Sequence, residues 1–184
     1  MDEVIERAEL LFDELNITKV RFAAGGADPE NARADFEDLL LDAYTEGYAA
    51  AAYILGEEID MDAADMEAVL HKEYNGVSIE WKFDHYYARG DEEKLSRLID
   101  SEYHRAYNAG SYDAARKSGK TLYKTWNAVL DDRTRETHDI LNATKIPFDE
   151  RFYSVSGDSA LYPGGFETAE ENSNCRCLLE YSVE

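Results

Sequence analysis

Residues 29–55 read PENARADFEDLLLDAYTEGYAAAAYIL and carry the clearest helical pattern of the chain. Apolar side chains recur every three or four residues along them, which is the spacing of one buried helix face. These side chains belong to Phe36, Leu39, Leu40, Ala43, Tyr44, Tyr48, Ala51 and Leu55. Asp28 suits the N-cap position before Pro29, and Gly56 suits the C-terminal end. The run of small residues from Gly47 to Ala52 predicts that another helix approaches closely here.

Similar patterns lie on either side of this helix. Residues 2–16 show the same apolar spacing, and a helix capped by Asp62 is expected to continue to Asn75-Gly76. Residues 74–83 alternate apolar and polar side chains, which fits a strand. The helical surroundings instead favour a helix that continues through residues 81–87.

The pattern changes in the second half of the chain. A helix is predicted from residue 92 to residue 108, a break at Gly110, and a short helix that restarts at Ser111. From about residue 121, prolines and glycines divide the chain into short pieces, with strands expected at 151–155 and 177–183. The sequence therefore predicts an α+β fold, with a mainly helical N-terminal part and a small mixed α/β C-terminal module.

Charge divides the chain in a similar way. The 184 residues have a net charge of -21, and residues 1–100 hold nine Lys and Arg against 26 Asp and Glu. Residues 101–184 hold ten against 14. We therefore expect two domains, an acidic helical region at 1–100 and a second domain at 101–184. The acidic region should repel nucleic acid and anionic membranes, so its expected partners are proteins.

Targeting signals are not expected in this sequence. No run of about 18 apolar residues is present, so the sequence predicts no transmembrane helix and no membrane partner. The N-terminal residues lack the basic and apolar regions of a signal peptide, which predicts a cytoplasmic protein.

One basic zone stands out against the acidic background. It consists of Arg105, Arg116, Lys117, Lys120 and Lys124. These cations could contact DNA phosphates or an acidic protein partner. An ordinary solvated surface is the simpler interpretation, because no aromatic platform for bases accompanies them.

A polar stretch follows at residues 131–138, which read DDRTRETH. Asp131 or Asp132 can cap a helix, and Arg135 and His138 share one helix face. The stretch fits either an Asp/Arg/His catalytic site or a set of structural hydrogen bonds between this helix and the loop behind it. We favour the structural interpretation, since no nucleophile or second acid can be placed beside these residues.

The two cysteines, Cys175 and Cys177, lie one residue apart, which is a poor geometry for a disulfide between them. Together with His138 they suggest a zinc site. A structural zinc site normally needs four ligands and a C-x₂₋₄-C spacing, and only His104 and acids remain to complete it. The sequence therefore predicts no metal site, with both thiols buried and Arg176 binding a carboxylate or carbonyl on the other side.

Residues of the last third resemble, in order and spacing, the phage Mu F-like family of minor head (head-morphogenesis) proteins of tailed phages. The residues that carry the resemblance are Lys124, Trp126, Asp132, Arg133, Arg135, His138, Pro163, Gly164, Asn174, Cys175, Arg176 and Cys177. The resemblance implies a minor capsid protein without catalytic residues or cofactors. It also implies binding to portal and/or capsid proteins during head assembly and DNA packaging or ejection, with contact to packaged DNA as an option. The expected location is the virion, at the capsid interior or portal vertex, and the host cytoplasm during assembly.

Two alternatives stay open at this point. An ADP-ribosyltransferase-like effector would use an arginine, a serine-containing strand and a glutamate pair, for which Ser154-Val155-Ser156 and residues 167–171 are the candidates. A DNA-binding module would use the basic zone. We expect a structural protein and not an enzyme.

Overall fold

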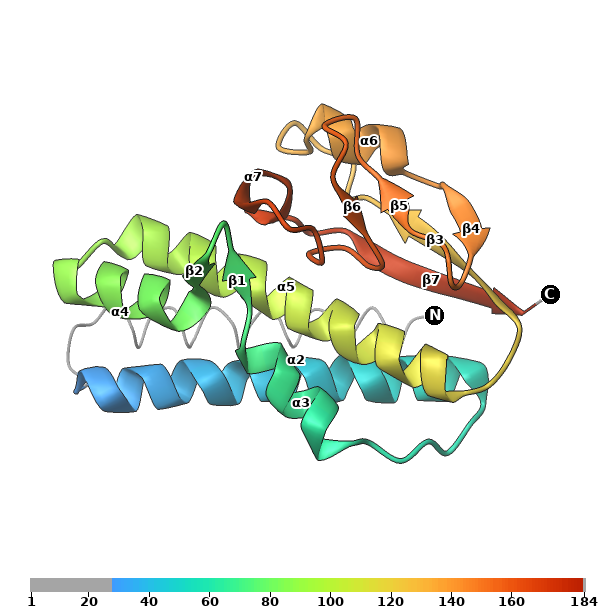
Figure 1. The fold of residues 1–184 in the computed structure, drawn as a ribbon, viewed down its shortest axis with the longest axis horizontal. Coiled ribbons are helices and arrows are strands. Elements are labelled where there is room, and N and C mark those ends of the chain that lie inside the picture. Colours follow the sequence, from blue (N-terminus) through green and yellow to red (C-terminus); the bar gives the residue numbers. More distant parts are fainter. Residues whose placement is uncertain (1–27, 184) are drawn as a thin grey trace.

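The structure is a computed structural model that describes residues 28–183. A layer of helices lies on one side, and a small module of strands and short helices packs on the other (Figure 1). This arrangement confirms the predicted α+β fold. The helix predicted at residues 2–16 lies outside the described residues. Among the described helices, none is long and apolar enough to cross a membrane.

Two long helices, α2 (Pro29–Leu55) and α5 (Glu92–Lys117), form the centre of the helical layer. The predicted ends of α2 are confirmed: the side chain of Asp28 accepts a hydrogen bond from the Glu30 amide, and Gly56 adopts a left-handed conformation. α5 runs without a break past residue 100. The domain boundary expected there therefore falls inside a single helix.

The two helices touch through their backbones. A Cβ atom added to Gly47 would lie 1.9 Å from the carbonyl oxygen of Tyr107, and one added to Gly110 would lie 1.9 Å from that of Tyr44. The close approach predicted at residues 47–52 is confirmed. The predicted break at Gly110 is wrong, because this glycine supplies the other half of the contact and does not end the helix.

Residues 63–89 pack beside these helices. α3 (Ala63–Leu70) ends earlier than predicted, and a hairpin of β1 (Glu73–Tyr74) and β2 (Val77–Ser78) follows it. The helix predicted across residues 74–78 is wrong, because Asn75 and Gly76 both have positive φ angles, of 53° and 75°, and form a tight hairpin turn. The expected helix begins afterwards as α4 (Ile79–Arg89), capped by the Ser78 hydroxyl.

The C-terminal module contains a three-stranded antiparallel sheet in the order β4-β3-β7. Its strands are β3 (Leu122–Asn127), β4 (Lys145–Pro147) and β7 (Leu178–Val183). A second pair consists of β5 (Phe152–Tyr153) and β6 (Ser159–Ala160), and two short helices are α6 (Glu136–Leu141) and α7 (Ala169–Asn172). β5 and β7 confirm the two predicted strands. Leu122 and Tyr181 of this sheet belong to the same buried cluster as the helices, so the two parts share one core.

We expect Gly110→Ala to destabilise the protein by about 2 kcal/mol or more, because its new methyl group meets a backbone atom that cannot rotate away. Helix propensity alone would stabilise this variant by about 1 kcal/mol, so the two effects have opposite signs. Urea unfolding of the purified protein measures the difference.

The control is Ser96→Ala, which lies on the same helix away from the crossing and should leave the free energy of unfolding nearly unchanged. A Gly110→Ala variant as stable as the wild type would contradict the backbone contact.

Candidate functional site

Trp126 is fully buried at the end of β3 and shares one buried cluster with Cys175 and Cys177, which like it belong to the motif residues, the residues that carry the family resemblance. Its ring makes edge contacts with Phe152 at 5.1 Å and His138 at 5.5 Å, and a tilted contact with Phe166 at 5.7 Å. Phe148 lies outside this group and stacks on Tyr112 of α5. Trp126 and its three neighbours thus define the interior against which the polar motif residues lie.

His138 is placed in this interior by α6 and is only 2% exposed. Its Nδ1 atom lies 3.4 Å from the Cys177 Sγ atom, and its Nε2 atom lies 3.5 Å from a carboxylate oxygen of Glu171. The cysteines are buried as predicted. The hydrogen bond with Cys175 and the nearby His138 hold the pKa of the Cys177 thiol below its usual range. The same pairing, together with burial, raises the pKa of Cys175.

Glu171 joins several segments of the module through its carboxylate. One oxygen accepts a hydrogen bond from Ser156 at 2.7 Å, and the other accepts one from Thr137 at 3.0 Å. Burial alone would raise the pKa of Glu171, but these hydrogen bonds bring it below the ordinary value. Arg135 donates to the Glu171 carbonyl oxygen at 3.1 Å. This buried carboxylate is therefore ionised and internally satisfied.

Asp131 forms the second polar contact of the motif. Arg176 donates two hydrogen bonds to its carboxylate, at 2.8 and 2.6 Å, in a bidentate arrangement of guanidinium and carboxylate. These bonds hold the pKa of Asp131 well below its usual range. The predicted carboxylate partner of Arg176 is confirmed. Asp132, the motif residue, is exposed. The Arg133 backbone amide donates to the Asp131 carboxylate at 3.0 Å, whereas its guanidinium approaches that carboxylate only to 3.6 Å.

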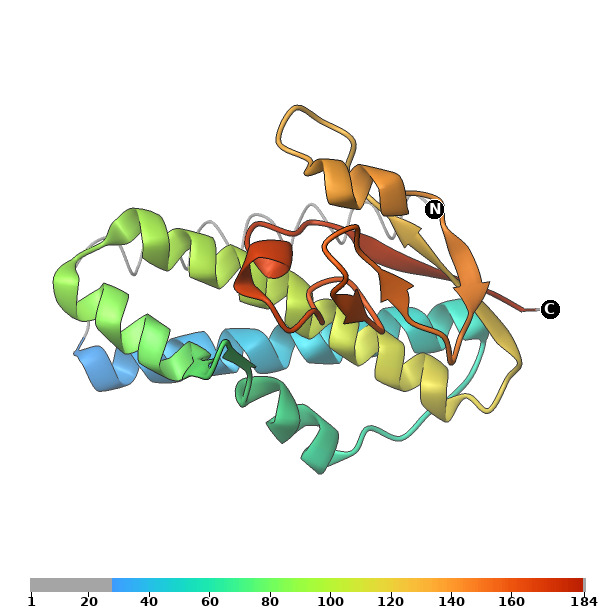
Figure 2. The same cartoon turned by 45° about the horizontal axis from the view of Figure 1, so that its top comes forward.

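The module lies against α5 (Figure 2), and polar side chains of this helix bind to it. Ser101 accepts a hydrogen bond from the Asn174 amide at 2.7 Å, and Asn108 donates one to the Cys177 carbonyl oxygen at 2.9 Å. Residue 174 has a positive φ of 56°, a conformation that asparagine tolerates well. The Cys-Arg-Cys segment is thereby attached to α5 on one side and to α6 on the other.

Arg105 lies on the same face of α5 and corrects the predicted basic zone. It is 3% exposed, binds Glu102 at 2.5 Å and donates to the Val69 carbonyl oxygen at 2.6 Å. Gly164 packs on it so closely that a Cβ atom would lie 2.8 Å from the Arg105 Cβ atom. The turn formed by Pro163 and Gly164 therefore covers this ion pair, and Arg105 is not available to DNA.

Lys124 is also buried, at 0% exposure. Its Nζ atom donates to the Leu161 carbonyl oxygen at 2.9 Å and lies 5.0 Å from the centre of the Tyr112 ring and 5.4 Å from that of Phe152. Burial, joined by the nearby guanidinium of Arg151, lowers the pKa of Lys124 to about 8. This lysine is an interior residue and not a phosphate contact.

The remaining cations of the basic zone are paired with acids. Arg116 and Lys117 both bind Asp65, at 3.2 and 2.9 Å, and Lys120 binds Glu57 at 2.9 Å. The zone therefore carries little free positive charge. The acids that neutralise it are distant along the chain, so the neighbouring sequence does not reveal them. Of the five residues predicted as a possible DNA or partner contact, Arg105 and Lys124 are therefore buried, and the other three form ion pairs.

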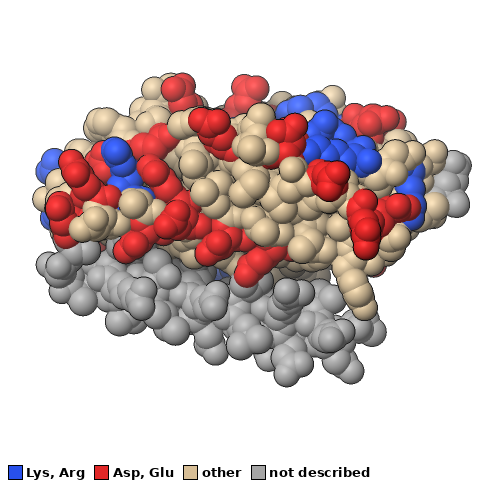
Figure 3. Space-filling model, turned by 90° about the horizontal axis from the view of Figure 1, so that it is seen from below, with Lys and Arg blue, Asp and Glu red and all other residues tan. Residues whose placement is uncertain are grey.

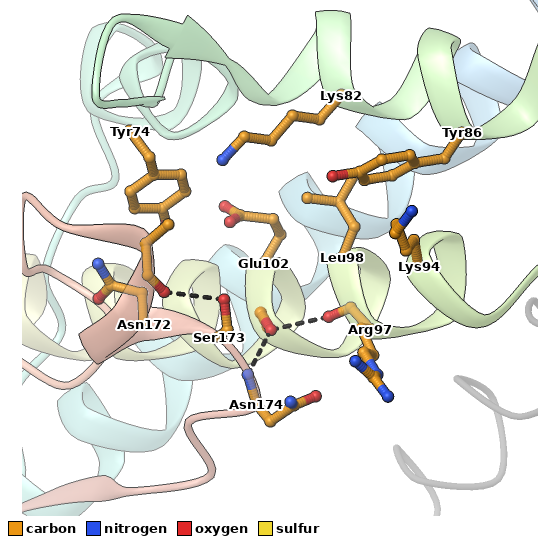
Figure 4. A pocket seen from close by; sticks show the side chains of 12 residues that line it. Tyr74, Lys82, Tyr86, Lys94, Arg97, Leu98, Glu102, Asn172, Ser173 and Asn174 are labelled. Carbon is orange, nitrogen blue, oxygen red and sulfur yellow. Dashed lines mark hydrogen bonds between the residues drawn. The ribbon is translucent and has the colours of Figure 1, made fainter. Parts of the chain in front are cut away.

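A cavity of about 240 Å³ opens beside the motif, between α4, α5 and α7 (Figure 4). Lys82 points across it toward Glu102, and its Nζ atom lies 4.5 Å over the ring of Tyr74. Asn174 is the one motif residue in its lining. Its walls contain cations, among them Lys82, and the carboxylate of Glu102, which already binds Arg105 of α5.

Several residues of the site were not predicted from the sequence. Glu171 looks like its exposed neighbour Glu170, and Ser101 and Asn108 look like ordinary polar positions of a helix. One signal was available: Ser101, Arg105, Asn108 and Tyr112 recur at intervals of four, three and four, which is the spacing of one helix face.

The buried lysine predicts a pH dependence of stability. In the unfolded chain Lys124 has its ordinary pKa of about 10.5, and in the folded chain about 8. Between these pH values the unfolded state binds a proton that the folded state lacks, so this lysine makes stability rise with pH. Relative to Lys124→Met, the wild type should gain stability from pH 8 to pH 10, as measured by urea unfolding.

The exposed Lys145 gives the control, because Lys145→Met retains the buried lysine and should keep the same rise. A Lys124→Met variant with the same pH profile as the wild type would show that Lys124 is not desolvated.

Comparisons with known proteins point to one family. The chain is 37% identical to the minor head protein GP7 of Bacillus phage SPP1 over 86 residues, which are 46% of this chain and 28% of that protein. It is 39% identical to the NAD(+)–arginine ADP-ribosyltransferase EFV of Enterococcus faecalis over 66 residues, which are 36% of this chain and 13% of that protein. The chain thus spans less than a third of either relative. No solved structure matches it.

The family match covers more of the chain than either relative does. It extends from residue 56 to residue 180, and so includes α5, the whole buried site around Trp126 and the first half of β7. On this match over more than half of its length, the chain belongs to the family of Phage Mu protein F like proteins.

Proposed function

We propose that this protein is a structural minor head protein that binds the portal or inner capsid protein of a tailed phage during head assembly. The observation that carries the proposal is the family match over residues 56–180, supported by the minor head protein among the relatives. The buried site fits such a role, because its charged groups Glu171, Arg135, Asp131 and Arg176 bind other groups of the same module.

The binding surface that we propose is the acidic side of α2. Asp35, Asp38 and Asp42 are exposed there, and acidic side chains spread over the face of the molecule seen from below (Figure 3). Such a surface favours a basic partner and raises the rate of encounter with it. It also disfavours DNA, which is an anionic partner.

The proposal is tested by co-expression with the portal protein and, separately, the major capsid protein of the same phage, followed by affinity measurements. We expect Asp35→Asn/Asp38→Asn/Asp42→Asn to weaken binding about tenfold, equivalent to about 1.4 kcal/mol, and the loss to shrink at high salt.

The matched control is Asp132→Asn/Glu136→Gln/Asp139→Asn, which removes the same charge from exposed positions near α6. Equal weakening by both variants would reject the acidic side of α2 as the binding surface. If the protein binds neither partner and is missing from virions, the proposed function is wrong.

We also propose that the chain has no ADP-ribosyltransferase activity. The predicted serine-containing strand is a turn that follows β5, and the glutamate beside it is Glu171. Both carboxylate oxygens of Glu171 already accept hydrogen bonds inside the module. It is 5% exposed, which leaves no access for a nucleotide. The transferase among the relatives shares only 13% of its length with this chain, so the shared segment accounts for a small part of that enzyme.

An NAD-consumption assay tests this proposal on the purified protein, and we expect no turnover above buffer. Glu171→Ala should lower the melting temperature because it removes two buried hydrogen bonds, whereas the exposed Glu170→Ala should not. NAD turnover by the wild type that disappears in Glu171→Ala would contradict a structural role.

A further inference from the structure

The geometry points to a zinc site in the C-terminal module, formed by the Nδ1 atom of His138 and the thiolates of Cys175 and Cys177. The sequence disfavoured a metal because the cysteines have an unusual spacing and no fourth ligand is evident. In the folded chain, however, the ligand atoms of these three buried residues all lie within 4.8 Å of one another. Two of them come from one short segment and the third from α6.

The distance between the imidazole and one thiol already fits zinc. Zinc binds sulfur at about 2.3 Å and nitrogen at about 2.0–2.1 Å in a tetrahedral arrangement, which places the two ligand atoms about 3.6 Å apart. The Sγ atom of Cys177 lies 3.4 Å from the Nδ1 atom of His138. An ion between them therefore requires a small adjustment of these two side chains and no change of backbone.

The second nitrogen of His138 gives independent support. Its Nε2 atom is buried and has no hydrogen-bond partner among the described residues, yet a Glu171 carboxylate oxygen lies 3.5 Å away. Metal binding at Nδ1 places the proton on Nε2, where it faces this carboxylate. Zinc-bound histidines regularly have such a carboxylate behind them, which fixes the ring and strengthens the ligand. Glu171 is itself held in place by Ser156 and Thr137.

The fourth position belongs to a water molecule. A cavity of about 20 Å³ adjoins His138 and Cys177, and this is about the space that a single water needs. Its lining also includes Asn174 and three arginines, Arg133, Arg135 and Arg176. Three protein ligands and one water are also found in catalytic zinc sites. A cavity of this size admits no substrate, so we infer an ion that stabilises the fold.

The charges balance in this arrangement. Binding of Zn²⁺ releases one proton from each thiol to solvent, and the ion with two thiolates and a neutral imidazole has no net charge. Two sulfur ligands and one nitrogen ligand favour zinc over magnesium or calcium, which prefer oxygen. The ion would join α6 to the segment that precedes β7, next to the hydrogen bond that joins this segment to α5.

Cobalt(II) is the probe for the test, because tetrahedral thiolate coordination gives it a visible absorption and a thiolate charge-transfer band. The full chain, reduced and stripped with a chelator, should bind one Co²⁺ with both signals, and zinc should displace it. Cys177→Ser and His138→Ala should lose the tetrahedral spectrum. Glu171→Gln should weaken binding by about 10- to 100-fold while keeping the charge-transfer band.

The matched control is His71→Ala, which changes an exposed histidine that also contacts a glutamate, Glu80, and should leave cobalt binding unchanged. Zinc should also raise the melting temperature of the stripped wild type, a measurement that does not depend on whether the variants fold. A stripped wild type that is folded by circular dichroism but shows neither the cobalt bands nor the thermal shift overturns the site. So does a Cys177→Ser variant with the wild-type cobalt spectrum.

Discussion

The backbone contact between α2 and α5 is the constraint on which the rest of the structure depends. At Gly47 and Gly110 each helix meets a carbonyl oxygen of the other, so neither position has room for a side chain. This contact uses one face of α5. The opposite face, which carries Ser101, Arg105 and Asn108, is left to receive the C-terminal module. A long helix that is buried on both sides explains why its polar residues are paired within the protein.

The sequence predicted the helices better than the connections between them. α2 and its two ends follow from apolar spacing and cap residues, which are local features. The helix break predicted at Gly110 is wrong, because a glycine that ends a helix and a glycine that permits close packing look alike in sequence. Only the partner helix distinguishes them. At Asn75-Gly76 two local patterns compete, because this dipeptide is typical of tight hairpins whereas the segments on either side of it favour helices.

The candidate site was predictable as a set of residues but not as a set of contacts. Burial of the cysteines follows from their chemistry, and so does the pairing of Arg176 with a carboxylate. The predicted basic zone differs from the structure for another reason. Arg105 and Lys124 are interior, and the acid that binds Arg116 and Lys117 is Asp65, about fifty positions earlier. A count of charges along the sequence contains no information on such pairs.

The boundaries of the family match bear on how the helical layer and the C-terminal module depend on each other. The match begins at residue 56, directly after α2, yet α2 covers the face of α5 that includes Ala106 and Gly110. Residues 56–180 alone would expose that face, along with much of the core that Leu122 shares with the helices. Apolar surface of this kind requires a covering element. In this protein, residues 56–180 therefore depend on α2 to complete the core. The same helix carries the proposed binding surface on its acidic side.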